Sequence, residues 1–277
     1  MHISSHCEHF RENVQVKPQQ EQSGDNTTVQ SLVRGLAVIR SFGTERPRQT
    51  LSEVAEETGL ARATARRFLH TLVTLGYADT DGSTFWLTPR ILELGFSYLS
   101  ALELPSIAQP RLEQLSRSIK ESSSLSVLDG TDIVYVNRVP VRKIMTVSIT
   151  IGTRFPAFAT SMGRVLLADL PESELEEYWA NADLSSLTPQ TITAREKLNS
   201  QLQAVRDQGF AIVDQELEPG LRSVAAPIYS PAGKVIAAIN VSTQSALRTT
   251  EDIKRTIVPE LLETARAITT DLKSTTY

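Results

Sequence analysis

The sequence predicts an α+β protein made of an N-terminal winged helix-turn-helix, a linker helix and a C-terminal domain built on an antiparallel sheet. Three observations favour this fold class. The chain of 277 residues exceeds the size of one average domain. Its first third holds three helical patterns and then a hairpin pattern, and the rest interleaves strands, hairpin turns and helices. We expect a tail at 1–28, the winged helix at 29–88, the linker helix at 89–104 and the second domain at 105–277.

The helix-turn-helix is predicted from three helical segments in a row. Apolar residues at helical spacing within 29–42 predict a first helix that completes the core. Thr50 or Ser52 can cap a short second helix, and Glu53 stands where a capping box or the helix dipole favours an acid. Gly59 then closes a tight turn before a longer third helix. This order of elements is that of a motif whose last helix enters the major groove of DNA.

The third helix, within residues 60–77, gathers arginines on one side. Residues 29–90 hold eight arginines, no lysine and six acidic residues, whereas the whole chain is acidic. At 100° per residue, an apolar stripe lies opposite Ala63, Arg66, Arg67, His70 and Thr74; the stripe comprises Ala61, Ala65, Phe68, Leu72 and Leu75. Because the planar guanidinium suits phosphate and guanine edges, we expect contacts to double-stranded DNA from Arg62, Thr64, Arg66 and Arg67. A solvated amphipathic helix is the alternative.

A wing and a connector are expected next. Two short strands around Asp81-Gly82 predict the wing. A helix from Pro89, a break near Pro105 and a further helix to Lys120 follow, and the first of these is the linker helix. A stiff helical connector transmits movement better than a Gly/Ser tether.

The second domain reads as a sheet with interleaved helices rather than as a Rossmann fold. Strand patterns and helical patterns alternate along it with antiparallel hairpin turns. We expect strands at 124–130, 132–139, 144–152, 211–215, 222–229 and 234–243, and helices at 161–169, 172–180, 195–208 and 251–273.

Composition argues against several classes of protein. No run of apolar residues could span a bilayer, and no apolar signal segment opens the chain, so we expect a cytoplasmic location and no membrane. The second domain contains no His and no Cys. It therefore cannot form a Ser-His pair, a Cys-His pair or a conventional zinc site, and it contains no GxxxxGK[ST] loop. We expect no enzyme and no cofactor. The polar, aperiodic tail predicts disorder and no metal site, although it carries the donors His2, His6, Cys7 and His9.

Several separated motifs resemble those of one family. The segments "VQSLVRGLAVIRSF", "LSEVAEETGLARATARRFLHTLVTLGY" and "LTPRILELGFSYL" are similar to the N-terminal half of IclR-type transcriptional regulators. The segments "IMTVSITIGTRFPAFATSMGRVLLADLP", "VRDQGFAIVDQELEPGLRSVAAPI" and "GKVIAAINVSTQ" resemble their effector domain, which implies a GAF-like fold. Within the family, the chain resembles most the branch that controls protocatechuate, 4-hydroxybenzoate and β-ketoadipate catabolism.

A small-molecule pocket is expected at the helix of residues 161–169. Its free N-terminal amides favour an anion such as a carboxylate, and simple N-capping by Thr160 or Ser161 is the alternative. The resemblance implies effector contacts from Ser161, Met162, Asp214, Ser223, Asn240 and Ser242, some relatives having Cys for Ser223 and Ser for Asn240. Arg222 could bind a ligand carboxylate or form an ion pair with Asp214 or Glu216.

The resulting expectation is a homodimeric or tetrameric regulator that binds a palindromic operator and a small aromatic or dicarboxylic acid. A dimer that places two helices one DNA turn apart gains the specificity that one helix lacks. Two alternatives stay open: a ligand-independent architectural DNA-binding protein whose second domain only oligomerises, and an enzyme with an appended DNA-binding module.

Overall fold

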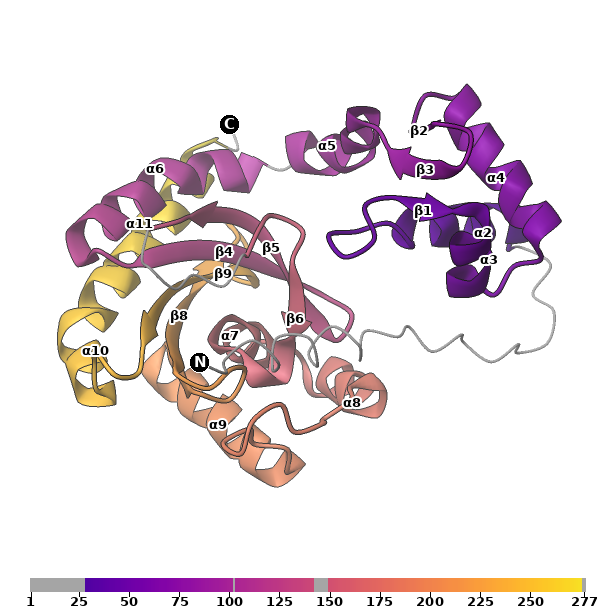
Figure 1. Cartoon of the computed structure of the whole chain (residues 1–277). Helices are drawn as coiled ribbons and strands as arrows, with labels where there is room; N and C mark the ends of the chain where they lie inside the picture. Colours follow the sequence, from indigo (N-terminus) through magenta and orange to yellow (C-terminus); the bar gives the residue numbers. More distant parts are fainter. Residues whose placement is uncertain (1–27, 102, 142–148, 276–277) are drawn as a thin grey trace. The chain divides into compact units, whose positions relative to one another are not determined.

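The computed structural model describes residues 28–101, 103–141 and 149–275, and the chain divides into two compact units after Ala101. Figure 1 shows the elements of each unit along the chain. The candidate metal donors of the tail and the strand expected at 144–152 lie wholly or mostly outside the described ranges. The α+β class with an N-terminal helix-turn-helix is confirmed.

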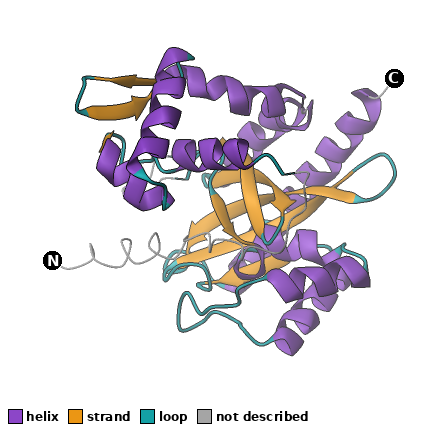
Figure 2. Cartoon of the chain, turned by 90° about the vertical axis from the view of Figure 1, so that its right-hand side faces the viewer, coloured by secondary structure: helices purple, strands orange, loops and turns teal. Residues whose placement is uncertain are grey.

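The first unit is a winged helix-turn-helix. Three helices enclose a small core that includes Val38, Val54, Ala65 and Leu69, and a three-stranded antiparallel sheet of order β1-β3-β2 completes it. Figure 2 shows the β2–β3 hairpin extending from the helices as the wing. The elements are α2 (Gln30–Arg40), β1 (Gln49–Thr50), α3 (Leu51–Thr58), α4 (Arg62–Thr74), β2 (Ala78–Thr80) and β3 (Thr84–Leu87).

The turn between α3 and α4 follows the predicted chemistry. Thr50 accepts a hydrogen bond from the Glu53 amide, and the Glu53 carboxylate accepts one from the Thr50 amide at 2.7 Å, which completes a capping box. Gly59 ends α3 with φ +66°, a left-handed conformation in which a side chain would be strained. The local sequence therefore fixes where α3 begins and where it stops.

Two apolar patterns of this unit differ from the prediction. On α2 only Val38 is buried, whereas Val29, Leu32, Val33 and Leu36 are exposed. On α4 the buried residues are Ala65, Leu69 and Leu72. Leu69 is not part of the expected stripe, and two of its expected members, Ala61 and Leu75, are exposed. The outer side of α2 is thus apolar but does not contribute to this small core.

The connector has its break earlier than predicted. A 3-10 turn η1 (Pro89–Ile91) leads into α5 (Leu92–Ala101), and α6 (Glu103–Ile119) begins two residues later. Pro105 therefore does not end a helix. It occupies the third position of α6, where a helix has no acceptor for the missing N–H.

In the described residues, the second unit is built on a six-stranded antiparallel sheet of order β6-β5-β4-β9-β8-β7. Helices α6 and α11 cover one face, and α7 covers the other with α9 packed against it. The strands are β4 (Ser122–Asp129), β5 (Asp132–Val139), β6 (Arg154–Pro156), β7 (Ala211–Asp214), β8 (Leu221–Tyr229) and β9 (Val235–Gln244). The helices are η2 (Ala157–Ala159), α7 (Ser161–Ala168), α8 (Glu172–Asn181), α9 (Arg195–Gln208), α10 (Thr250–Thr256) and α11 (Val258–Thr275).

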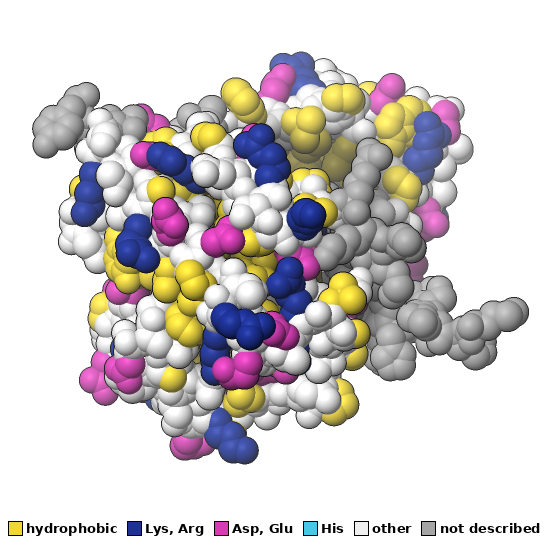
Figure 3. Space-filling model, turned by 90° about the vertical axis from the view of Figure 1, so that its left-hand side faces the viewer, with side chains coloured by type: hydrophobic (Ala, Val, Ile, Leu, Met, Phe, Trp, Pro, Cys, Tyr) yellow, Lys and Arg dark blue, Asp and Glu magenta, His cyan; other side chains and the backbone are white. Residues whose placement is uncertain are grey.

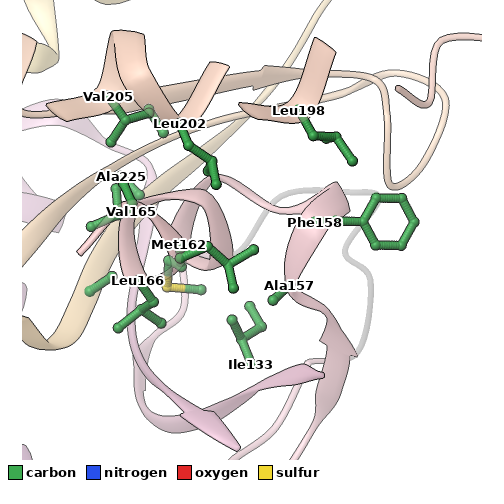
Figure 4. Close-up of a cluster of buried hydrophobic side chains, with 14 of the residues drawn as sticks. Ile133, Ala157, Phe158, Met162, Val165, Leu166, Leu198, Leu202, Val205 and Ala225 are labelled. Atoms are coloured by element: carbon green, nitrogen blue, oxygen red, sulfur yellow. The ribbon is translucent and has the colours of Figure 1, made fainter. Parts of the chain in front are cut away.

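The core between the sheet, α7 and α9 is apolar. Figure 4 shows side chains of Met162 and Val165 from α7, Leu202 and Val205 from α9, and Ala225 from the sheet meeting there. Phe158 also belongs to this cluster and is 1% exposed. Burial of this cluster holds α7 against the sheet, since apolar contact is the main favourable term in folding.

The opposite face of the unit carries mixed charge. Basic and acidic side chains alternate on the side of α10 and α11 (Figure 3), and some of them pair, as Arg111 does with Asp271 at 2.8 Å. A nucleic-acid surface needs clustered basic residues. On the described residues of this face, basic side chains are interspersed with acidic ones instead.

The helix expected at 251–273 is two helices, with Ile257 between α10 and α11. Pro259, the second residue of α11, cannot donate a backbone hydrogen bond and so marks a new helix start. Among the described residues, no single helix could cross a membrane by length and composition.

Candidate nucleic-acid interface and ligand pocket

The arginines of α4 are exposed and unengaged. The guanidinium groups of Arg62, Arg66 and Arg67 form no hydrogen bond or ion pair with any described residue, and Thr64 is partly buried. Two arginines outside α4, by contrast, have acidic partners: Arg46 pairs with Glu57, and Arg48 pairs with Asp81 at 3.2 Å. The predicted cationic side of α4 therefore exists, and its cations are free to meet an anion.

The N-terminus of α4 adds backbone donors to this side. Its N-cap is Ala61, which offers no capping side chain, and the first turn contains no acidic residue. Thr64 and Ala65 already donate to the Ala61 carbonyl, whereas the amides of Arg62 and Ala63 have no intrahelical acceptor. A helix start of this kind favours a phosphate.

The wing is held rigidly by its own side chains. Asp81 accepts hydrogen bonds from the Ser83 and Thr84 amides at 2.9 and 2.8 Å, and these bonds hold the pKa of Asp81 well below its usual range. The Arg48 guanidinium lies 3.7 Å from the Trp86 ring centroid. The two hydrogen bonds of Asp81 thus close the turn at the tip of the hairpin.

The α7 side of the second sheet carries two polar rows. Ser122, Ser242 and Ser223 are consecutive cross-strand partners on β4, β9 and β8, and Ser124 pairs with Asn240 in the next row. Paired residues share a face of a sheet. This face is the one toward α7, because Ser126 on the same strand donates to Met162 Sδ at 3.2 Å. The sequence-based candidates Ser223, Asn240 and Ser242 are therefore neighbours.

The start of α7 lies over this face with polar groups unused. Thr160 caps the helix by accepting from the Gly163 amide at 3.0 Å. The hydroxyl of Ser161 and the Oδ1 atom of Asn240 are buried and have no hydrogen-bond partner among the described residues. Buried polar atoms are rarely left unpaired in this way. Ser161 on α7 and Asn240 on β9 thus each hold a buried polar atom without a partner, and α7 packs against β9.

Gly163 sets how close α7 comes. A Cβ atom on Gly163 would lie 2.0 Å from the Ala157 carbonyl oxygen of η2. Two non-bonded atoms cannot approach so closely, so only glycine permits η2 and α7 to meet backbone to backbone.

Asp214 and Arg222 occupy different strand positions from the other five pocket candidates. Asp214 pairs with Arg222 across β7 and β8, whereas Val213 pairs with Ser223. A shift of one position along a strand reverses the face, so Val213 faces α7 and Asp214 does not. The two form an ion pair at 2.7 Å, and Arg222 also donates to the Arg248 carbonyl.

Sequence reasoning missed Arg138 on the α7 side. Arg138 is the cross-strand partner of Ser124 on β5. Strict alternation from the buried Tyr135 would place Arg138 on the opposite face, but the register shifts so that Ser126 pairs with Tyr135 and Leu125 with Asn137. This bulge at Val136 turns Arg138 back toward the side of Tyr135. No pattern in the sequence marks such a bulge.

Metal chemistry has no candidate in the part of the chain that the structure describes, since no three His, Cys, Asp or Glu residues there could hold an ion.

Comparisons with known proteins agree with this architecture. Residues 31–82 match the model of the IclR helix-turn-helix domain, and residues 96–270 that of the C-terminal domain of bacterial transcriptional regulators of the IclR type. The Pca regulon regulatory protein of Pseudomonas putida is 43% identical over 88% of this chain and 84% of its own. The p-hydroxybenzoate hydroxylase transcriptional activator of Acinetobacter baylyi is 38% identical over 87% of this chain and 90% of its own.

Solved structures show the same fold. That of a proposed transcriptional regulator from Rhodococcus sp. RHA1 has a TM-score of 0.81 and 58% identity over 90% of this chain and all of the other. An IclR homologue from Microbacterium hydrocarbonoxydans, solved with 4-hydroxybenzoate, has a TM-score of 0.77 and 26% identity over 88% of this chain and 99% of the other. The resemblance to the branch of aromatic-acid pathway regulators is confirmed, and the chain belongs to the IclR family of bacterial transcriptional regulators.

Proposed function

We propose that this chain regulates genes of aromatic-acid catabolism by binding a palindromic operator as a dimer, under the control of a small organic acid. The names of two relatives, a Pca regulon regulator and an activator of p-hydroxybenzoate hydroxylase, support this pathway. The related structure that holds 4-hydroxybenzoate supports an effector of the protocatechuate, 4-hydroxybenzoate or β-ketoadipate class. We place the protein in the cytoplasm, where its operator would be.

The observation that carries the DNA-binding proposal is the unpartnered arginine side of α4. Arg66 and Arg67 are exposed in mid-helix, and Arg62 stands at its start beside two free amides. Cations that the fold itself does not use are available for phosphates and base edges. Thr64, which is partly buried, contributes least to this surface.

Replacing both Arg66 and Arg67 with alanine tests this assignment. Affinity for the native promoter at fixed salt should fall, and the slope of log affinity against log salt should become shallower by up to about two units if both contact phosphate. If the two read guanine, discrimination between operator and mismatched DNA should fall instead. The matched control replaces Arg34 and Arg46, which lie outside α4. Equal binding by both double variants would contradict the role of α4.

We assign the effector to the polar region between α7 and the sheet, with contacts from Ser161, Met162, Ser223, Asn240 and Ser242. Two of these residues hold buried polar atoms that no described residue satisfies, and a bound acid would supply partners for them. Asp214 and Arg222 stay outside this pocket as an ion pair on the other face of the sheet.

A second copy of the chain is the partner that we assign to the apolar side of α2. Val29, Leu32, Val33 and Leu36 recur at helical spacing, and each is about half exposed or more. A palindromic operator needs two copies of α4, and pairing through an isologous surface supplies them. Helix α5 is similarly apolar outside, with Leu92 and Phe96 each about 70% exposed.

Calorimetry separates this proposal from an architectural protein that ignores ligands. We expect one or more of protocatechuate, 4-hydroxybenzoate and β-ketoadipate to bind and to change operator affinity, because only a ligand that distinguishes the two states can shift their populations. Failure of all three acids to bind would favour the architectural protein. We propose no catalytic activity, and turnover of these acids by the purified protein would contradict that.

A further inference from the structure

Arg138 on β5 is partly buried, and its guanidinium forms no hydrogen bond or ion pair with any described residue. Burial lowers the pKa of its guanidinium, with only the Tyr135 hydroxyl acting in the other direction. Burying part of a charge without a partner lowers the stability of the folded state, so we look for a function of Arg138 outside folding.

The other described cations near α7 are already used. Arg164 is 1% exposed, donates to the Phe158 carbonyl at 3.0 Å and pairs with Glu216 at 2.6 Å. Arg222 lies on the opposite face with Asp214. Arg138 is thus the one described guanidinium on this side that is available to an incoming anion.

Its position continues the polar row of the candidate pocket. Arg138, Ser124 and Asn240 are successive partners across β5, β4 and β9. Two strand spacings, about 10 Å, separate the first from the last, and an extended arginine side chain covers much of that span. The first turn of α7 lies over the same strand, since Met162 contacts Ser126, one same-face position from Ser124.

We propose that Arg138 binds the carboxylate of the effector, while the polar atoms of Asn240 and Ser161 meet its other end. This inference rests on the proposed effector site and names the group that recognises the charge. A guanidinium binds a carboxylate through two parallel hydrogen bonds. The positive end of α7 adds a second attraction for negative charge, so the pocket should select an acid over its neutral analogue.

The test compares each acid with its neutral amide. Full-length protein and the variants Arg138→Gln and Arg138→Lys are titrated with 4-hydroxybenzoate, protocatechuate and β-ketoadipate, and with 4-hydroxybenzamide and the amides of the other two. Wild type should prefer an acid over its amide, and Arg138→Gln should bind that acid at least about 30-fold more weakly while its preference over the amide disappears. Arg138→Lys should retain part of the preference. Circular dichroism melting shows whether each variant is folded.

Arg154→Gln is the matched control, since Arg154 lies on the edge strand β6 and is paired with Asp129 and Asp132. Its acid preference should equal that of wild type. If wild type binds an acid and folded Arg138→Gln keeps the same preference, the inference about Arg138 is overturned while the effector site stands. If wild type binds no acid, both fail together.

Discussion

Arg164 and Glu216 form a buried ion pair in which Nη2 lies 2.6 Å from Oε2. The same carboxylate oxygen accepts from the Ile192 amide at 2.9 Å, and the Arg164 Nε atom donates to the Phe158 carbonyl. The pair therefore joins α7 to the segment after β7, to the loop before α9 and to η2. These bonds hold α7, the helix at the candidate pocket, in its position.

Replacing Arg164 with methionine should destabilise the second unit by about 3–5 kcal/mol, because the Glu216 carboxylate would stay buried without its cation. The change combined with Glu216→Gln should cost less than the sum of the two single changes. Urea unfolding followed through Trp179 measures both. Arg154→Met, which breaks exposed pairs, should cost about 0–1 kcal/mol. Additive losses would show that the two side chains do not act together.

Gly163→Ala should be among the most harmful small substitutions in the chain. Its methyl group would enter the space of the Ala157 backbone, which cannot move away as a flexible side chain could, so we expect a loss of about 3 kcal/mol or more. Thermal unfolding measures it. Gly95→Ala on α5, where nothing lies within 4 Å, should be neutral or stabilising by up to about 1 kcal/mol. Similar behaviour of the two variants would refute the close contact.

The apolar side of α2 should control the dimer of the DNA-binding unit. Leu32→Glu together with Leu36→Glu places two charges on it and should weaken self-association and operator affinity while binding to a half-site persists. Analytical ultracentrifugation and operator titration measure these effects. Ser31→Glu, exposed on the other side of the same helix, should leave both unchanged. An unaltered association state of the double variant would remove α2 from the interface.

The wing should lose stability in acid through Asp81. Its pKa is lowered in the fold by hydrogen bonds from Thr84 and Ser83, so its stabilising contribution is fully present above its ordinary value of 3.8. That contribution is lost as pH falls below 3.8 toward the lower folded pKa. Asp81→Asn should flatten this part of the curve. Fluorescence of Trp86 in a Trp179→Phe background monitors the unit, and an Asp81→Asn variant that loses as much stability in acid as wild type would contradict this role of Asp81.

Local chemistry made much of the first unit predictable. Thr50 and Glu53 determine the start of α3 through short-range hydrogen bonds, and Gly59 determines its end through one backbone conformation. Such features depend on residues that are close together in the sequence, so they can be predicted from it. The apolar side of α2 was predicted as core and is exposed, because periodicity shows that a helix has an apolar side and does not say whether the same chain covers it.

The pocket was harder to predict, for reasons of strand geometry. Ser223, Asn240 and Ser242 fall together as expected, but Asp214 is one position from Val213 and hence on the other face. Arg138 reaches the α7 side only through the bulge at Val136. Successive side chains of a strand point to alternate faces of the sheet, and one extra residue in a bulge reverses this order for the residues that follow. A single sequence does not show where a bulge occurs.

The lengths of the strands in the second sheet protect the protein from polymerising. The outermost strands, β6 and β7, have three and four residues, whereas those between them have eight to ten. An exposed strand edge invites another chain to add to it, and a short edge offers few free amides and carbonyls for that addition. Among the described residues, the sheet thus ends on each side in a short strand, and we expect concentrated protein to stay free of fibrils.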